Sequence, residues 1–348
     1  MLKEQNQHIL VLDKGGIASG GSGAAGAFVS PKIGKGSVLQ KLTNEAFAYA
    51  KDFYLDVCPM YFNQTGVVRV PKDKQDAMAF STYEKYNENN YKVYSKETLH
   101  SLGIDSDFDS FYFPEAGSCD ALGVCEYLLK DIEVLKYEVT HLSQQNGIWK
   151  VGDYKAKNII LATGHEHDLA DLRYMGIRGT WGNRGDFSTH LDLKVSMHQS
   201  MSVGANHEGI IKLGATHEKE IKKAIPCSHA QASSLKQRAS GLINTSDLEL
   251  KKVFCGMRAG SKDYVPLLGK VIDVPYMLKT YPALTRGAKP ALTYRENLYV
   301  FNGLGGRGFV FAPLLAKWLS DYIINNKELK SNVCADRLFL KWCRKGMK

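Results

Sequence analysis

The sequence lacks a hydrophobic run that could cross a membrane. No apolar stretch reaches the about 18 residues that a membrane-spanning helix needs, and the first residues, Met1 to His8, are polar, unlike a secretory signal peptide. These absences exclude a membrane protein and favour a protein of the cytoplasm.

Cysteine is sparse, and its spacing fits neither a disulfide framework nor a zinc site. There are seven cysteines in 348 residues, an odd number, and no two form a Cys-x-x-Cys pair. We therefore expect reduced, mostly buried thiols. The cysteines are Cys58, Cys119, Cys125, Cys227, Cys255, Cys334 and Cys343. The run His165-Glu166-His167-Asp168 lacks further ligands nearby and is interpreted as a polar loop, so no metal is expected.

The composition is that of an ordinary globular protein, with 44% hydrophobic and 23% charged residues. At about 150 residues per domain, the length allows two domains. Lysine and arginine exceed aspartate and glutamate by 45 to 36, a net charge of +9. This charge favours a polyanionic partner such as nucleic acid, although a basic protein without such a partner fits it equally well.

Hydrophobic periodicity predicts both strands and helices. Apolar runs predict buried strands at 9–12, 67–70, 137–142, 149–151, 158–161, 210–213 and 298–301, with an Asn146-Gly147 turn. Three- and four-residue spacing predicts helices at 37–57 and 312–324, with Pro313 in the first turn of the second. A further helix, capped by Ser118 or Asp120, is expected to bury Leu122, Cys125, Leu128 and Leu129.

Glycine is abundant, with 32 residues, and it forms two Gly-x-Gly-x-x-Gly motifs. The first, Gly21 to Gly26, begins eight residues after its strand ends and opens no helix, so its context differs from a dinucleotide fingerprint. The second, Gly303 to Gly308, lies correctly between a strand and a helix, but only 40 residues follow it. Each motif alone is weak.

Together the two motifs suggest a chain that enters a doubly wound fold late and returns to it at the end. Asp13 would then be the acid at the tip of the second strand, where such folds bind ribose hydroxyls. The loop Gly303–Gly308 would close on the cofactor from the other side, with a helix N-terminus that stabilises an anionic ring.

Five segments resemble the FAD-dependent oxidases of the D-amino-acid/glycine oxidase superfamily. Within that superfamily they are most similar to the oxidase half of the bifunctional tRNA-modifying MnmC family. The segments are 17–27 with Pro31 and Lys32, 159–164, Arg178-Gly179, 256–258 through Asp263 to 266–269, and 302–315.

The resemblance implies an α/β fold of mixed α+β character. A doubly wound FAD-binding domain, lacking its first strand, would be formed by residues 1–60, 115–175 and 257–348. A second domain with an antiparallel sheet, formed by 61–114 and 176–256, would bind the substrate. The cofactor implied is FAD. Its expected contacts are Asp13, Lys14, Ser19, Ser22, Gly23, Ala24, Gly26, Val139, Ala162, Gly164, Gly303, Gly305, Gly306, Arg307 and Gly308.

The reaction implied is the oxidative removal of the carboxymethyl group from carboxymethylaminomethyl-(2-thio)uridine at the tRNA wobble position. Arg258 matches the carboxylate-binding arginine of glycine oxidases, and a guanidinium is the best fork for a carboxylate. Its alternative is a structural ion pair with Asp263. Arg307, in the second glycine loop, would contact flavin, substrate or a tRNA phosphate.

Compared with that family, the chain starts almost on the second strand, so the first strand and its glycine-rich pyrophosphate loop are expected to be missing. No methyltransferase half is recognised, so no methyl transfer is expected. The partners implied are tRNA and either a separately encoded methyltransferase or the missing N-terminal segment. The basic tail offers phosphate contacts or only a solvated helix end. It comprises Arg337, Lys341, Arg344, Lys345 and Lys348.

Two other functions remain open. A small-molecule oxidase of glycine, sarcosine or a D-amino acid would also use Arg258 but would not need a basic surface. The other alternative is a non-catalytic remnant that binds RNA or a partner without flavin. The missing first strand motivates this alternative.

Overall fold

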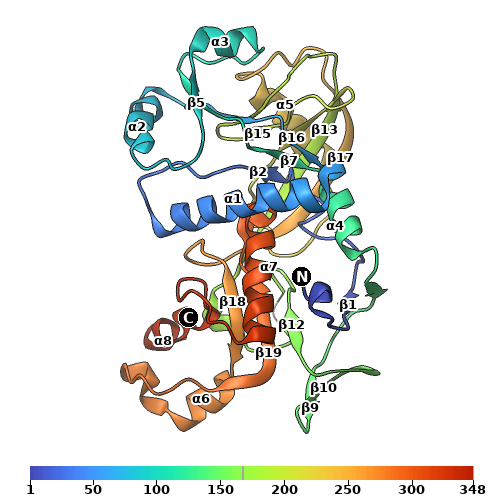
Figure 1. Ribbon diagram of the computed structural model, residues 1–348, viewed down its shortest axis with the longest axis vertical. Helices are drawn as coiled ribbons and strands as arrows, with labels where there is room; N and C mark the ends of the chain where they lie inside the picture. The colour runs from blue at the N-terminus through green and yellow to red at the C-terminus, as the bar shows by residue number, and fades with distance from the viewer. Residues whose placement is uncertain (167, 348) are drawn as a thin grey trace.

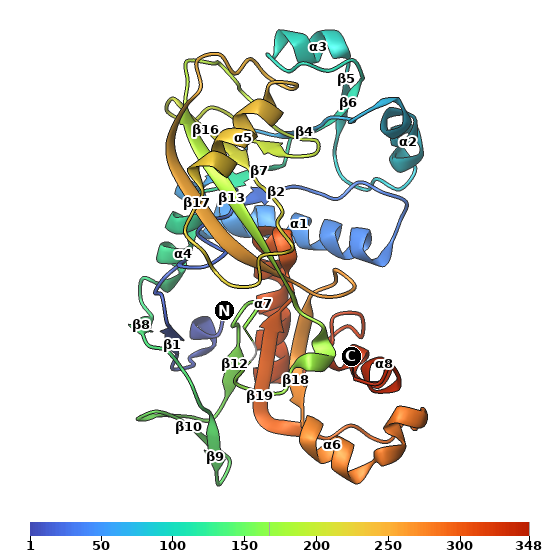
Figure 2. The same ribbon diagram turned by 180° about the vertical axis from the view of Figure 1, so that it is seen from behind.

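The computed structural model describes residues 1–166 and 168–347. The molecule is elongated, with a large sheet at one end and a smaller, partly parallel sheet at the other (Figures 1 and 2). The long helix α1 (Val38–Val57) lies across the middle and packs against α7 (Gly308–Asn325), which runs toward the smaller sheet (Figure 1). Segments from the first and last parts of the chain therefore pack together at the centre of the molecule.

The large sheet has eight strands in the order β17-β13-β16-β15-β14-β4-β6-β5. All neighbours are antiparallel except β14 and β4, which are parallel. The strands are β4 (Val67–Arg69), β5 (Lys92–Tyr94), β6 (Ser110–Phe113), β13 (Arg178–Ser188), β14 (Ser196–His198), β15 (Ser202–Val203), β16 (Ile210–Gly214) and β17 (Glu249–Gly260). Helices α2 (Lys74–Glu84), α3 (Lys96–Ser101) and α5 (His229–Ala239) accompany this sheet.

Two short parallel ladders lie at the other end. Strand β1 (Leu10–Asp13) pairs in parallel with β8 (Glu133–Lys136). Strand β12 (Ile159–Leu161) pairs in parallel with β19 (Tyr294–Asn302), which is antiparallel to β18 (Leu267–Ile272). Parallel strands with helical crossovers are typical of doubly wound folds, so the sequence prediction of a mixed α/β chain with a separate antiparallel sheet is confirmed.

Smaller elements connect these layers. Two three-stranded sheets are β2 (Phe28–Val29), β7 (Gly117–Cys119) and β3 (Phe62–Asn63), and β9 (Ser143–Gln145), β10 (Ile148–Val151) and β11 (Tyr154–Ala156). The remaining α-helices are α4 (Ala121–Leu129), α6 (Val274–Thr280) and α8 (Phe339–Arg344). The 3-10 turns are η1 (Lys3–Gln5), η2 (Pro59–Tyr61), η3 (Arg173–Met175), η4 (Pro282–Arg286), η5 (Gly305–Arg307) and η6 (Ala335–Leu338).

Helix α7 starts four residues earlier than the sequence predicted, so Pro313 lies inside it rather than in its first turn. A proline has no N–H to donate to the carbonyl four residues back, which here belongs to Phe309. The Tyr54 hydroxyl of α1 donates to the Phe309 carbonyl oxygen at 2.8 Å. A side chain from the neighbouring helix thus supplies the missing donor and allows α7 to continue.

Two other local predictions were wrong. Helix α4 buries Ala121, Gly123 and Val124 instead of its leucines. The Tyr61 ring packs directly on Gly123, so a Cβ at Gly123 would overlap that ring. Leu122 and Leu128 are consequently 46% and 42% exposed. The strand expected at 137–142 occurs earlier, as β8, because its partner β1 ends at Asp13 and the ladder ends with it.

The prediction of seven reduced cysteines fails for two of them. Cys227 and Cys255 form a disulfide with an S–S distance of 1.91 Å. Asn183 explains the pairing, since it lies opposite Cys255 in the β13–β17 ladder and its side-chain oxygen accepts the backbone N–H of Ser228 at 3.1 Å. The other five cysteines are free thiols. Within the described residues, no helix is long and apolar enough to cross a membrane.

Candidate active site

Three strand ends that are far apart in the sequence lie close together. Lys14, directly after β1, pairs with Glu166 after β12, with 2.5 Å between Nζ and Oε1. Asn302, the last residue of β19, donates its side-chain amide to the Gly164 carbonyl at 2.7 Å. The predicted contact residues Asp13, Lys14, Gly164 and Gly303 therefore share one neighbourhood.

Asp13 shapes the loop that follows it. Its Oδ1 accepts the backbone N–H groups of Gly15 and Gly16, each at 2.8 Å, and the Ser19 hydroxyl at 3.2 Å. One carboxylate oxygen is thus committed to the loop. The predicted role toward a ribose depends on the other oxygen, Oδ2.

The first glycine loop, residues 15–26, forms turns and no helix, as expected. It packs against β17 so closely that backbone touches backbone. A Cβ at Gly21 would lie 2.6 Å from the Met257 carbonyl oxygen, and a Cβ at Gly256 would lie 2.9 Å from the Gly21 Cα. Arg184 of β13 also donates to the Ala25 carbonyl. Glycine is required here by close approach.

The second glycine loop lies against the same strand. Gly260 of β17 forms an isolated antiparallel bridge with Leu304, and a Cβ at Gly306 would lie 3.9 Å from the Arg258 Cδ. Gly303 and Gly305 have φ angles of +75° and +59°, which favour glycine. The two motifs from opposite ends of the chain thus flank the stretch of β17 between Gly256 and Gly260.

Arg258 projects from this stretch. Its Nη1 lies 2.8 Å from His217 Nε2, and its Nη2 donates to the Thr216 carbonyl. Space for the guanidinium comes from Gly182, where a Cβ would overlap Nη2. Burial lowers the pKa of Arg258, and the charge of Glu218 opposes this shift. The half-buried cation therefore lies directly beside the second glycine loop.

The alternative pairing of Arg258 with Asp263 is wrong. Asp263 instead binds Arg337, with 2.9 Å between Oδ1 and Nη2. Arg337 also donates to the Pro266, Val265 and Cys334 carbonyls, and its side chain is 15% exposed. Arg337 is thus a structural residue and not a free phosphate contact. Lys341, Arg344 and Lys345 lie in and just after α8, and Lys348 lies outside the described residues.

Sequence reasoning missed the surroundings of Arg307. Arg307 ends the η5 turn, and burial lowers its pKa. Burial lowers the pKa of Lys32, and the charge of Arg307 lowers it further. Burial and the charge of Arg307 also lower the pKa of Arg69, to about 9. His198 is adjacent, with its pKa lowered to about 2 by burial and by these cations. Lys32, Arg69 and Arg307 are named here the cation cluster.

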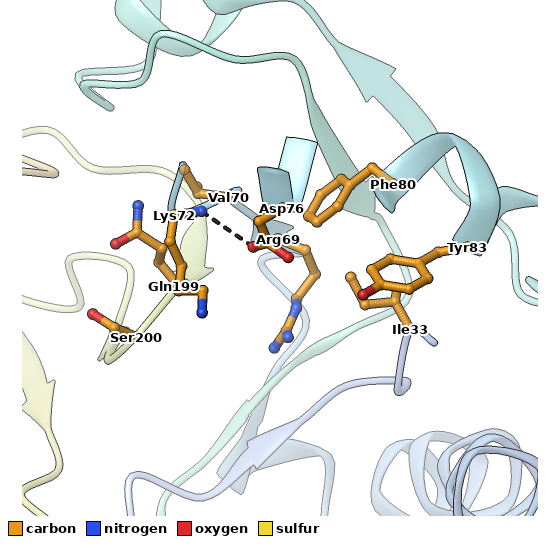
Figure 3. A pocket seen from close by; sticks show the side chains of 9 residues that line it. All are labelled: Ile33, Arg69, Val70, Lys72, Asp76, Phe80, Tyr83, Gln199 and Ser200. Carbon is orange, nitrogen blue, oxygen red and sulfur yellow. Dashed lines mark hydrogen bonds between the residues drawn. The ribbon is translucent and has the colours of Figure 1, made fainter. Parts of the chain in front are cut away.

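The cation cluster has no acidic partner at ion-pair distance among the described residues. The sequence contained one signal for it, because Arg69 is a charged residue inside the otherwise apolar strand Val67–Val70. Arg69 also lines a cavity of about 380 Å³ (Figure 3).

Two other predicted FAD contacts, Val139 and Ala162, lie farther along the chain after β8 and β12. Val139 lies three residues after β8, and its side chain packs with Leu12 against a hydrophobic core. The loop after β12 contains Ala162 and Gly164, the latter with a φ of +65°. Residue 167 of the polar run lies outside the described residues, and the described part of the chain contains no metal-binding group of His, Cys, Asp or Glu.

Comparisons with known proteins extend this description. In curated sequences, the chain is 23% identical to the tRNA 5-methylaminomethyl-2-thiouridine biosynthesis bifunctional protein MnmC of Shewanella amazonensis, over 88% of this chain and 52% of that protein. It is 24% identical to the protein of the same name from Legionella pneumophila, over 94% and 52%. The chain thus spans about half the length of these relatives.

Solved structures show the same fold at low identity. Glycine oxidase from Geobacillus kaustophilus aligns with a TM-score of 0.74 and 14% identity, over 94% of this chain and 90% of that chain. L-proline dehydrogenase from P. horikoshii aligns with a TM-score of 0.74 and 13% identity, over 99% and 93%. The family model for FAD dependent oxidoreductases matches residues 1–322. The chain therefore belongs to the FAD-dependent oxidoreductase family.

Proposed function

We propose that this protein oxidises the carboxymethylaminomethyl group of a tRNA wobble uridine, or of its 2-thio form, to give aminomethyluridine and glyoxylate. The observation that carries this proposal is the position of Arg258, a half-buried guanidinium beside the Gly303–Gly308 loop. The names of the curated relatives supply the tRNA part.

The residues present fit FAD. Cβ atoms at Gly16, Gly20, Gly164 and Gly308 would meet no atom within 4 Å, so each of the three loops borders open space. The N-terminus of α7 has no side-chain cap, and its first N–H groups carry a partial positive charge that favours an electron-rich ring. The loops leave room for the cofactor and present donors to it.

The expected contact residues would hold FAD from three sides. Asp13 and the first loop would bind the ribose and pyrophosphate side, and the second loop would face the ring. Residues 1–60, 115–175 and 257–348 would form this FAD-binding unit, and residues 61–114 and 176–256 the substrate-binding unit. The latter include most of the eight-stranded sheet.

When bound, FAD accepts a hydride from the carbon between the amine nitrogen and the carboxylate of the substrate. Arg258 would fix that carboxylate and so orient this carbon. Loss of the hydride and the N–H proton leaves an imine, and water adds to its carbon. The C–N bond then breaks, giving the aminomethyl nitrogen on the uridine and free glyoxylate.

Arg258 is prepared for this role by its neighbours. His217 lies at Nη1 and the Thr216 carbonyl accepts from Nη2, so each terminal nitrogen is held and keeps one further N–H. A fork held in this way binds a carboxylate with less loss of side-chain entropy. Arg307 would contact the flavin, the substrate or a tRNA phosphate.

The direct experiment measures glyoxylate formed from tRNA that carries carboxymethylaminomethyluridine. FAD-loaded protein should release one glyoxylate per modified uridine. Protein that loads FAD, ignores this tRNA and oxidises free glycine or sarcosine would instead be a small-molecule oxidase. Protein that folds but stays colourless after incubation with FAD would be a non-catalytic remnant.

Salt provides a second discriminator. Each phosphate contact contributes about 0.7 to 0.9 to the negative slope of log affinity against log salt concentration. A tRNA substrate should therefore show a steep salt dependence of KM, while a free amino acid should show a shallow one.

A further inference from the structure

The residues that line the cavity around Arg69 do not include Arg258. Its volume is about 380 Å³, and its walls come from α2, β4, the turn after β14 and Ile33. Figure 3 shows Arg69 extending between Tyr83 and Ile33 on one side and Gln199 and Ser200 on the other. Lys72 and Ser200 are exposed, so the cavity reaches the protein surface.

Arg69 is an unsatisfied cation. Its Nε is buried and has no hydrogen-bond partner in the described residues. Asp76 also lines the cavity, and its charge opposes the lowering of the Arg69 pKa, but its Oδ2 accepts the backbone N–H of Lys72 at 3.2 Å and it forms no ion pair with Arg69. A buried donor without a partner is costly to a folded protein, which points to a partner that arrives with a ligand.

The other two members of the cation cluster strengthen the same field. Lys32 is half-buried and precedes the cavity residue Ile33, and Arg307 belongs to the second glycine loop. The charge of Arg307, in addition to burial, lowers the pKa of Lys32 and of Arg69, although neither Lys32 nor Arg307 lines the cavity itself. A bound anion would reduce the charge repulsion among these three cations.

The chemistry of the lining selects the kind of anion. A guanidinium binds oxyanions through paired N–H groups. Gln199, Ser200 and the Tyr83 ring offer polar and aromatic surfaces beside it, and aromatic rings are common supports for unpaired bases. A carboxylate already has Arg258 as its expected partner.

We propose that Arg69, supported by the charges of Lys32 and Arg307, forms an oxyanion-binding site in this cavity, which takes a phosphate group of the RNA substrate. The identity of the ligand as RNA rests on the proposed function. The site would place a nucleotide next to the modified uridine, and it would set the preference for RNA over a free amino acid.

The test uses FAD-saturated protein, so that added phosphate does not report on the cofactor site. Wild type, Arg69→Met and the matched control Lys74→Met, an exposed cation on α2, are compared. Two measurements are made, namely the shift in Tm with inorganic phosphate or acetate, and the affinity for a short single-stranded oligouridylate. Lys32→Met repeats the test from another segment of the chain in case Arg69→Met does not fold.

The expected result is that phosphate raises the Tm of wild type and Lys74→Met but not of Arg69→Met. RNA affinity should fall roughly ten- to a hundredfold in Arg69→Met, as for a lost charge-assisted hydrogen bond. The salt slope should fall by about 0.7, one phosphate contact on a single strand. Without phosphate, Arg69→Met should be at least as stable as wild type, because an unpaired buried cation has been removed.

Equal phosphate shifts in all three proteins, or unchanged RNA affinity in both Arg69→Met and Lys32→Met, would overturn the site. An Arg69-dependent response to acetate but not to phosphate would overturn its assignment to phosphate. Glyoxylate assays on the same variants separate this inference from the proposed function. RNA binding that depends on Arg69 without any release of glyoxylate would support the oxyanion-binding site and contradict the proposed reaction.

Discussion

The side-chain amide of Asn302 donates to the carbonyl oxygen of Gly164 at 2.7 Å, and this bond joins the ends of β19 and β12. Asn302 Oδ1 also accepts the Gly303 N–H at 2.7 Å, and the residue is 2% exposed. One buried side chain thus holds the loop after β12 against the second glycine loop. Since parallel strands direct their carboxyl ends to one edge, this is where a doubly wound fold binds its ligand.

Replacing Arg258 by alanine should abolish efficient turnover while FAD remains bound. A charge-assisted hydrogen bond to a substrate carboxylate contributes roughly 1.5–3 kcal/mol, so kcat/KM should fall at least about tenfold. The measurement is glyoxylate formation together with flavin content. Lys251→Ala, an exposed cation of the same strand, is the control and should keep wild-type rates. Loss of flavin in Arg258→Ala would contradict the assigned role.

Alanine at Gly21 should prevent the first glycine loop from packing on β17. The new Cβ would lie 2.6 Å from the Met257 carbonyl oxygen, which is fixed in the β13–β17 ladder. We expect a clear drop in Tm of the FAD-free protein. At Gly20, the neighbouring position, a Cβ meets no atom within 4 Å, so Gly20→Ala should leave that Tm unchanged. Equal effects of the two substitutions would show that the loop lies elsewhere.

Replacing Tyr54 by phenylalanine should destabilise the protein by about 1–3 kcal/mol, because the partly buried Phe309 carbonyl then loses its donor. The free energy of unfolding in urea measures this effect. Tyr49→Phe is the matched control, since Tyr49 lies on the same helix and its hydroxyl makes no hydrogen bond within the described part of the chain. A similar small loss in both variants would mean that α7 does not depend on Tyr54.

The ion pair of Asp263 and Arg337 predicts a defined pH dependence. Burial raises the pKa of Asp263, but hydrogen bonds and the charge of Arg337 outweigh it and hold the pKa below its usual value. Because the folded pKa is depressed, the stabilisation is present above the ordinary value of about 3.9 and is lost as the pH falls further.

Unfolding of wild type and Asp263→Asn should therefore be compared between about pH 6 and pH 2.5. The stability difference should be constant at the upper end and shrink below about pH 4. A difference that grows toward low pH would show that Asp263 is not held as a carboxylate by Arg337.

Local patterns predicted the elements that depend on their own residues. The helix at 38–57 and the strands at 10–13, 67–69 and 159–161 follow from apolar spacing. The start of α7 could not be predicted, since the donor that tolerates Pro313 comes from Tyr54, 259 residues away from it in the chain. The exposed leucines of α4 likewise depend on how Tyr61 packs against Gly123.

Only the parts of the candidate site that depend on short local patterns could be predicted from the sequence. Glycine motifs and Arg258 are visible as short patterns, and their residues lie around one stretch of β17. Lys32, Arg69 and His198 come from three separate segments whose proximity depends on sheet order, in which β4 lies beside β14. The Cys227–Cys255 disulfide also depends on the long β13–β17 ladder. Sequence spacing contains no information about such contacts.

An anaerobic titration of the FAD-loaded protein with tRNA carrying carboxymethylaminomethyluridine tests the proposed reaction most directly. The visible flavin absorbance should bleach in proportion to the modified uridine added, with one glyoxylate per flavin reduced. Bleaching by glycine or sarcosine with no response to this tRNA would contradict it, as would protein that binds no FAD.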